Sequence, residues 1–472
     1  MLRFFIGTHY LLALVLLFTG PLFSQKLSEK PSFERVDGLM EAFLTKTKLP
    51  GLSISIAREG QLLYSKGFGF ADVERQRPMQ PETSIRTASV AKVLTATALG
   101  RLISEGKLDI DAPIKNYVSY LESPYANLTV RQLAGHTAGV PHRPKKKKNR
   151  RYSNTRERIE LMEKGELLFE PDTEYRYSSH AYNLLAAVIE GAAAKSYESF
   201  MQEDVFAPLG MTHTKPEVLS ALSEQDASAY FFKKDKLTKD TKLVDGSYKL
   251  AGAGFRSTSV DLVKMMRAYS NGFIEQPVVQ TMFQSHQLKD GQQTQVGLGW
   301  RINQDMHGRK TVEHAGSWQG ARTVIVHYPA EDVSISIMIN AKCVIFIEET
   351  AHLIAQFFLE KAWDHPIEQD IDQTIRVSSQ VAGETDEFDG RLTFDKARKG
   401  QLKMQISSEW IRRSDVYPLA KTSDWILSTT FGFLYLKMDV TPALTGNIHQ
   451  YQRIGDAFHP MKKAWLRFQP QK

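Results

Sequence analysis

The chain has 472 residues, which is long enough for two or three domains and a sizeable hydrophobic core. Hydrophobic residues make up 42% and charged residues 24%, as in folded globular proteins, and a formal net charge of +7 is too small at this length to indicate nucleic-acid binding. The single cysteine, Cys343, excludes an intrachain disulfide, and the 13 histidines form no recognisable metal motif, so the sequence predicts no metal site.

Residues 1–24 have the features of a secretory signal peptide. Arg3 supplies the positive end, and residues 10–18 form an apolar run that is too short to span a bilayer comfortably. We expect cleavage after Ser24 and a mature protein that is secreted or periplasmic. An uncleaved segment that anchors the chain in the membrane is the alternative.

Predicted strands lie at both ends of a long, mostly helical middle region that covers about residues 86–300. Strict alternation of apolar residues indicates a strand, and apolar residues three and four positions apart indicate a helix. The other predicted elements are a helix at 33–44, strands at 51–57, 61–67, 323–328 and 333–339, and a helix at 347–363. This order predicts an antiparallel sheet built from both ends of the segment, with a helical subdomain beside it.

The pattern changes after about Asp370. Short alternating runs, separated by Gly and Asp, predict strands at 392–394, 402–406, 425–429 and 431–438. We therefore expect one domain at residues 25–365 and a small all-β domain at residues 370–472. No residues of the second domain suggest chemistry.

Ser89 and Lys92 are the first candidates for catalysis. They lie three residues apart at the start of a predicted helix, so the amine lies on the same face as the hydroxyl. A desolvated lysine can activate a serine as a nucleophile, and a helix N-terminus favours developing negative charge. The spacing alone is weak evidence, because a chain of this length contains such a pair by chance.

Seven segments, in order, resemble the motifs of the penicillin-recognising serine hydrolases, specifically the class C β-lactamase-like group. They are Ser89-Val-Ala-Lys92, His136-Thr-Ala-Gly-Val-Pro141, Tyr177-Ser-Ser179, Pro208-Leu-Gly-Met-Thr212, Ala251-Gly-Ala-Gly254, Gly297-Leu-Gly-Trp300 and His314-Ala-Gly316. The resemblance covers roughly residues 33–362. It implies an α+β chain with the β-lactamase/transpeptidase-like fold, in which an antiparallel sheet flanked by helices is joined to a helical subdomain.

The resemblance also implies a role for each motif residue in acyl transfer. Ser89 is the expected nucleophile, and Lys92 accepts its proton or lowers the pKa of a neighbour. Tyr177 corresponds to the active-site tyrosine of the family and is expected to act as base and then as acid. The oxyanion hole is expected from the N–H groups of Ser89 and Ser317, because Gly316 lets the strand approach closely.

Two departures from the family pattern bear on the substrate. Ser179 stands where the family usually has Asn, and a hydroxyl cannot donate two amide hydrogens to a substrate. His314 stands where β-lactamases carry Lys, so a permanent cation for a substrate carboxylate is missing. Both changes disfavour β-lactam hydrolysis and suit an esterase or peptidase. The segments 177–190 and 246–252 look most like the mitochondrial serine β-lactamase-like branch of the family, which is regarded as a hydrolase or protease.

Residues 143–151 form a basic run. It can be read as a rim that attracts an anionic substrate or the anionic surface of the cell envelope, or as a solvated loop, which is the commoner case.

Together these observations predict an exported serine hydrolase that acts through an acyl-enzyme on small-molecule or peptide-like ester or amide substrates. Neither a metal nor an organic cofactor is expected, and nucleic acid is not an expected partner. The alternatives are a D-alanyl-D-alanine carboxypeptidase or class C-type β-lactamase, and a non-catalytic protein that binds cell-wall fragments or takes part in assembly. The sequence does not indicate the oligomeric state.

Overall fold

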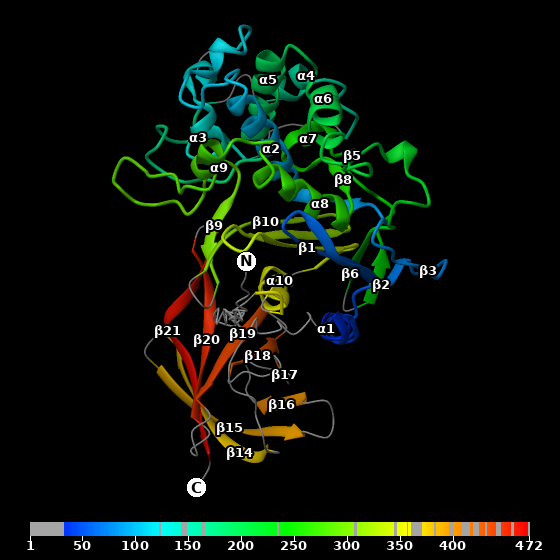
Figure 1. Cartoon of the computed structure of the whole chain (residues 1–472), viewed down its shortest axis with the longest axis vertical. Coiled ribbons are helices and arrows are strands. Elements are labelled where there is room, and N and C mark those ends of the chain that lie inside the picture. Colours follow the sequence, from blue (N-terminus) through cyan, green and yellow to red (C-terminus); the bar gives the residue numbers. More distant parts are fainter. Residues whose placement is uncertain are drawn as a thin grey trace, which may run out of the picture. The chain divides into compact units, whose positions relative to one another are not determined.

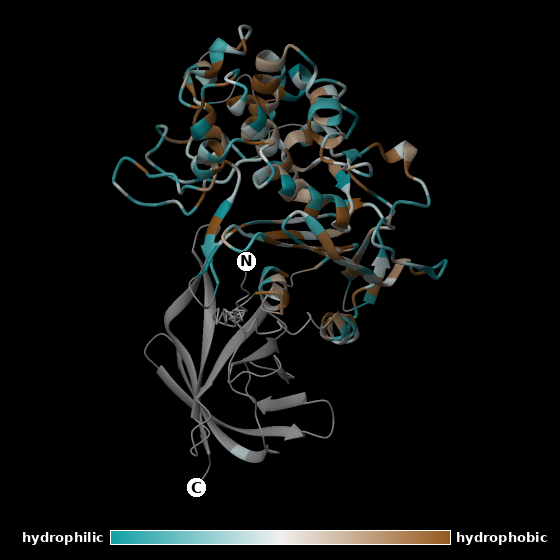
Figure 2. Ribbon diagram, in the orientation of Figure 1, coloured by the Kyte–Doolittle hydropathy of each residue, from teal (hydrophilic) through white to brown (hydrophobic). Residues whose placement is uncertain are grey.

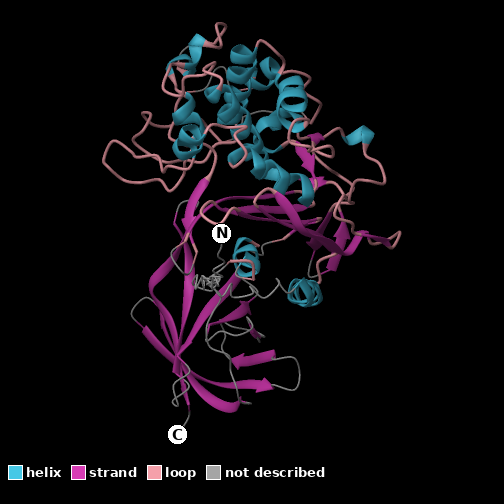
Figure 3. Cartoon of the chain, viewed as in Figure 1, coloured by secondary structure: helices cyan, strands magenta, loops and turns pink. Residues whose placement is uncertain are grey.

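The computed structural model describes residues 33–121, 124–142, 149–161, 166–233, 236–305, 309–343, 347–355 and 357–359. It also describes the backbone of strands between residues 371 and 470, where Thr374 is the one residue whose side chain is described. The predicted signal peptide at residues 1–24 and most of the basic run lie outside the described residues. Within them, no helix combines the length and the apolar character that a membrane crossing requires. Figure 3 shows helices and strands mixed in the way expected of an α+β chain.

Seven antiparallel strands form the main sheet, in the order β3-β2-β1-β12-β11-β10-β9 (Figure 1). The strands are β1 (Gly51–Arg58), β2 (Gln61–Asp72), β3 (Arg77–Pro78), β9 (Arg301–Gln304), β10 (Lys310–Trp318), β11 (Ala321–Tyr328) and β12 (Val333–Ile339). Leu52 of β1 is paired with Ile339 of β12, so the sheet joins both ends of the segment. The predicted antiparallel sheet is confirmed.

Helices α1 (Phe33–Thr47) and α10 (Glu348–Ala355) pack on one face of this sheet. Met40 and Ile354 share a buried apolar cluster with Ile54 and Ile337, and the sheet strands carry long hydrophobic stretches (Figure 2). The helix predicted at 347–363 is shorter in the structure, where α10 ends at Ala355. After Ala355 the described backbone turns with hydrogen bonds to carbonyls three residues back, which tightens and ends the helix.

Helices are the main regular elements of the middle region, as predicted, and loops join them. Its α-helices are α2 (Ala91–Ser104), α3 (Val130–Ala134), α4 (Thr155–Glu160), α5 (Ala181–Ala193), α6 (Tyr197–Phe200), α7 (Leu250–Ala253), α8 (Ser259–Met265) and α9 (Gln276–Met282). Short 3₁₀ segments occur at Ala88–Val90, Ile114–Asn116, Tyr125–Asn127, Leu219–Ala221, Ser247–Lys249 and Met266–Tyr269, and a π-helix at Met201–Phe206. The sequence did not predict its small strands, which are β4 (Ile85–Arg86), β5 (Lys215–Pro216), β6 (Tyr230–Lys233), β7 (Lys236–Lys239) and β8 (Phe255–Ser257). β4, β8 and β5 form one small sheet, and β6 and β7 form another with β13 (Ala341–Lys342).

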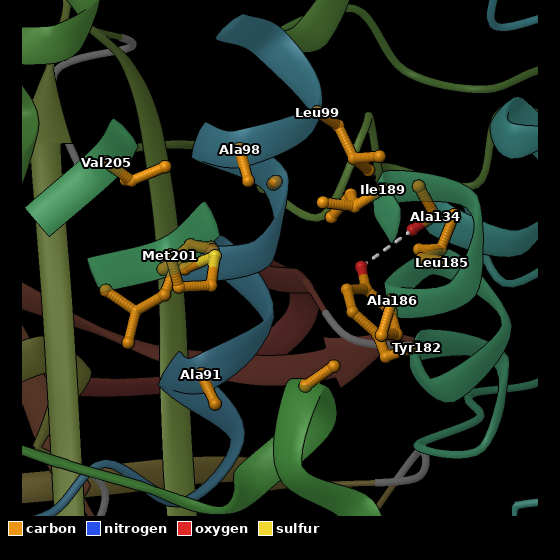
Figure 4. Packing of buried hydrophobic residues seen from close by; sticks show 14 of the residues in the cluster. Ala91, Ala98, Leu99, Ala134, Tyr182, Leu185, Ala186, Ile189, Met201 and Val205 are labelled. Atoms are coloured by element: carbon orange, nitrogen blue, oxygen red, sulfur yellow. Dashed lines mark hydrogen bonds between the residues drawn. The ribbon is translucent and has the colours of Figure 1, made fainter. Parts of the chain in front are cut away.

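Helix α2 is the central helix of the middle region. Eleven of its 14 residues are buried, including Lys92, which is expected of a helix enclosed on all sides. Figure 4 shows Leu99 pointing toward Ile189 of α5, while Ala98 lies on the side of Met201. This packing holds the N-terminus of α2, which carries Lys92 and directly follows the turn with Ser89, in a fixed position.

The C-terminal strands form a separate eight-stranded antiparallel sheet in the order β16-β15-β14-β21-β20-β19-β18-β17. They are β14 (Ile371–Val381), β15 (Glu384–Asp395), β16 (Gln401–Ile406), β17 (Val416–Pro418), β18 (Asp424–Thr429), β19 (Gly432–Asp439), β20 (Thr445–Ile454) and β21 (Ala457–Pro470). The sequence predicted four of these strands and missed β14, β17, β20 and β21.

Candidate active site

Ser89 lies in a 3₁₀ turn at Ala88–Val90 that leads into α2. Ala88 has a φ of 47°, a left-handed conformation that is uncommon for a residue with a Cβ and that often marks a functional site. Thr87 fixes this turn, because its N–H and its hydroxyl both donate to the carbonyl of Phe255 in β8, at 2.9 and 3.0 Å. Ala88 and Val90 are buried whereas Ser89 is only half-buried, so the turn presents the serine.

The side chain of Lys92 is fully buried one turn after Ser89. Its Nζ donates to Ser179 Oγ at 3.1 Å and to the carbonyl of Gly252 in α7 at 2.8 Å. The same Nζ lies 4.6 Å from the centre of the Tyr177 ring. Lys92 therefore connects the nucleophile helix to the segment that carries Tyr177 and Ser179.

Three histidine rings surround Tyr177. The ring centres of His136, His142 and His314 lie 4.4, 5.6 and 6.4 Å from that of Tyr177. The N–H of Ser178 donates to His136 Nδ1, so this ring is neutral with its proton on Nε2. His136 thus orients the backbone at Ser178.

Sequence reasoning missed His142. Its Nδ1 accepts the N–H of Ser179 at 3.3 Å, and its ring is exposed beside Tyr177. The signal was its place directly after Pro141 at the end of a recognised motif. A single histidine in a loop carries no pattern that separates this role from a solvated surface position.

Strand β10 passes directly beside the nucleophile turn. A Cβ built on Gly316 would lie 2.5 Å from the carbonyl oxygen of Thr87 and 2.7 Å from the N of Ser89, closer than real Cβ atoms approach. Gly316 is therefore required for this contact, which holds the strand against the amide that is expected to stabilise an oxyanion.

The N–H of Ser317 also points toward this site. Trp318 is paired with Ala321 across a two-residue turn, and paired residues alternate between hydrogen-bonded and non-hydrogen-bonded positions. Ser317 therefore occupies a non-hydrogen-bonded position, with its N–H directed away from β11. β9 pairs with β10 only as far as Glu313, so neither neighbouring strand of the main sheet bonds this N–H.

His314 lies on the same face of β10 as Gly316, two residues away, and is buried. Its Nδ1 lies 2.9 Å from the carbonyl oxygen of Ala315. A carbonyl can only accept, so Nδ1 carries a proton and Nε2 is the atom that can accept a hydrogen bond in a neutral ring.

The structure thus brings together the seven residues singled out in the sequence, from three places: the start of α2, the segment before α5, and β10. They are Ser89, Lys92, Tyr177, Ser179, His314, Gly316 and Ser317. Their catalytic roles remain predictions. In the described part of the chain, no group of three or more His, Cys, Asp or Glu side chains could hold a metal ion.

A buried ion-pair network supports the nucleophile turn. Arg86 in β4 makes a two-point contact with Glu217, with distances of 2.7 and 2.6 Å. Glu217 also pairs with Arg256 at 3.1 Å, and Arg256 pairs with Asp226 at 2.7 Å. Arg86 directly precedes Thr87, so this network fixes the strand from which the turn begins.

Tyr177→Phe is expected to lower kcat for ester hydrolysis by about 100-fold, because the variant removes only the phenolic hydroxyl group that is expected to transfer the proton. The ring contacts with His136 remain, so the melting temperature should stay close to that of the wild type. Steady-state kinetics and thermal unfolding measure the two quantities. An unchanged kcat would remove Tyr177 from the proton path.

A family model described as Beta-lactamase matches residues 36–345. The chain is 30% identical over 295 residues to the mitochondrial serine beta-lactamase-like protein LACTB of Homo sapiens, in a match that covers 48% of this chain and 54% of that protein. The chain therefore spans about half the length of the curated relatives that it matches first.

Solved structures share the fold. The octameric penicillin-binding protein homologue from Pyrococcus abyssi has a TM-score of 0.61 at 19% identity, covering 92% of this chain and 100% of its own. The D-amino acid amidase from Ochrobactrum anthropi SV3 has a TM-score of 0.57 at 21% identity, covering 66% and 92%. These similarities confirm the β-lactamase/transpeptidase-like fold. Together with the family match, they place this chain in the β-lactamase family of serine hydrolases.

Proposed function

We propose that the protein hydrolyses ester or amide bonds through an acyl-enzyme at Ser89. The observation that carries the proposal is the contact between Gly316 and the N of Ser89, because it places a strand edge against the nucleophile turn. Lys92, one turn after Ser89, contacts the ring of Tyr177 at 4.6 Å. A nucleophile, proton carriers and oxyanion donors are the parts that acyl transfer needs.

The reaction has two halves. Ser89 Oγ attacks the substrate carbonyl and gives its proton to Tyr177, whose ionised form the charge of Lys92 stabilises. The negative oxygen of the tetrahedral intermediate accepts hydrogen bonds from the N–H groups of Ser89 and Ser317. Tyr177 returns the proton to the leaving group. Water then attacks the acyl-serine by the same proton path, which releases the acid and restores Ser89.

The preference for esters and non-β-lactam amides rests on Ser179 and His314. Ser179 Oγ already accepts from Lys92, so it offers a substrate amide at most its one hydroxyl hydrogen. The amidase similarity supports activity on amides. A D-alanyl-D-alanine carboxypeptidase or β-lactamase is the second candidate, and a non-catalytic binding protein is the third. We also propose export to the periplasm or the exterior, from the composition of residues 1–24.

Fluorophosphonate labelling tests the nucleophile. Wild-type protein should gain one label on the peptide that contains Ser89, and Ser89→Ala should gain none there. Ser220→Ala, which changes an exposed serine in a 3₁₀ turn outside the site, should label like the wild type and is the matched control. Labelling of Ser89→Ala at the wild-type rate would contradict the mechanism.

The same preparations separate the substrate classes. Faster turnover of 4-nitrophenyl esters than of nitrocefin supports the proposed preference, and the reverse order supports the β-lactamase alternative. Absence of both labelling and turnover supports the non-catalytic alternative.

A further inference from the structure

Two cations lie over the ring of Trp318, at the end of β10. The Cζ of Arg86 is 4.3 Å from the ring centre, and the Nζ of Lys249 is 4.0 Å from it. Both distances are well inside the range in which a cation is attracted to an indole ring. A third contact fixes the ring, because a Cβ on Gly246 would lie 2.9 Å from two of its carbons.

Trp318 is close to the reacting position. It lies two residues beyond Gly316 on the same face of β10, which is about 7 Å along the strand. Ser317, between them, is exposed, and Trp318 is half-exposed, so this end of the strand is open to solvent.

Lys249 reaches Trp318 from a different segment of the chain. It ends the 3₁₀ turn at Ser247–Lys249 that runs directly into α7. Three residues later, the carbonyl of Gly252 accepts the hydrogen bond from Lys92. The ammonium of Lys249 is therefore held between the strand that carries Ser317 and the segment that carries a partner of Lys92.

The two cations differ in what they can offer a substrate. Arg86 is only 2% exposed and is engaged by both oxygens of Glu217. Lys249 is half-exposed, so its positive charge on the indole face lies nearer to solvent than that of Arg86. Because Trp318 restricts its position, Lys249 loses little additional side-chain freedom when it binds an anion.

We infer that Trp318 and Lys249 form a substrate subsite for the carboxylate of an acyl substrate whose carbonyl lies at Ser89. This inference rests on the proposed hydrolase function and names its substrate class: esters or amides that carry a carboxylate several bonds from the scissile carbonyl. His314 stands where the related β-lactamases have a permanent cation. Lys249 instead supplies a positive charge over Trp318, at the end of β10 that lies beyond Ser317.

The test uses two esters that differ only at the end of a six-carbon acyl chain, mono-4-nitrophenyl adipate and 4-nitrophenyl hexanoate. The measured quantity is selectivity, the ratio of kcat/KM for adipate to that for hexanoate, with the uncatalysed rates subtracted. Lys249→Met, which keeps the length of the side chain and removes its charge, should lower this ratio at least 10-fold, mainly through KM for adipate. Raising the salt concentration should lower the wild-type ratio and leave that of the variant unchanged.

Lys242→Met is the matched control, because Lys242 is an exposed lysine of the preceding loop, outside the subsite. It should leave the ratio unchanged. An unchanged ratio in Lys249→Met, or an equal fall in Lys242→Met, would overturn the subsite. In either case, hydrolysis of the hexanoate ester by the wild-type protein would still support the proposed hydrolase function. If the wild-type protein hydrolyses neither ester and takes no fluorophosphonate label, the proposed function fails and the subsite fails with it.

Discussion

Gly316→Ala is expected to lower kcat/KM for ester hydrolysis by roughly 1000-fold, an effect of the size seen when an oxyanion donor is lost. The added methyl group would meet backbone atoms, the carbonyl oxygen of Thr87 and the N of Ser89, at 2.5 and 2.7 Å. Backbone cannot rotate away as a side chain can, so β10 and the nucleophile turn must separate. That separation moves the N–H groups of Ser89 and Ser317 apart.

Gly38→Ala is the matched control for this change. Gly38 lies inside α1, and a Cβ there would meet nothing within 4 Å. Alanine should leave kcat/KM unchanged and stabilise the helix by about 0.5–1 kcal/mol. Kinetics and thermal unfolding of both variants distinguish a local effect from misfolding. If Gly316→Ala retains wild-type activity, β10 does not supply the oxyanion hole.

Glu217→Ala is expected to lower the free energy of unfolding by about 3–5 kcal/mol, because it leaves the buried charge of Arg86 without its carboxylate partner. Arg86 and Glu217 are 2% and 1% exposed, and Glu217 also binds Arg256 at 3.1 Å. Removal of the carboxylate leaves two guanidinium groups close together in the core. Urea unfolding at pH 7 measures the loss.

Two further variants test whether charge is the cause. Glu217→Gln keeps the shape of the side chain and should also be strongly destabilised, whereas a packing effect would be largely rescued. Asp111→Ala removes one partner of an exposed pair with Arg131 and should cost at most about 1 kcal/mol. If Glu217→Gln is as stable as the wild type, the network does not hold the nucleophile turn by charge.

The parts of the fold that the sequence predicted are those with local patterns. The alternation at residues 51–57 and 333–339 located two strands, and their place at opposite ends of the helical insert predicted one shared sheet. Ser89 and Lys92 could be paired because three positions on a helix share a face. The family motifs added Tyr177, which no local pattern indicates.

The parts that could not be predicted depend on contacts between distant segments. Arg86, Glu217, Arg256 and Asp226 come from separate turns and strands, and each alone has the pattern of a surface charge. His142 reaches Tyr177 only because the loop after the His136 motif passes that ring. The contact of Lys249 with Trp318 likewise arises from the path of the chain, which sequence spacing does not reveal.

The pairing of β1 with β12 has a consequence for biosynthesis. β1 leaves the ribosome early, yet its partner is among the last core strands to be translated, so the sheet closes late and the contact order is high. A nascent chain that has reached α2 already carries the serine and the lysine, but the strand with Gly316 has not yet been made. The proposed hydrolytic activity therefore requires translation of the chain through β10, and shorter translation products are expected to lack it.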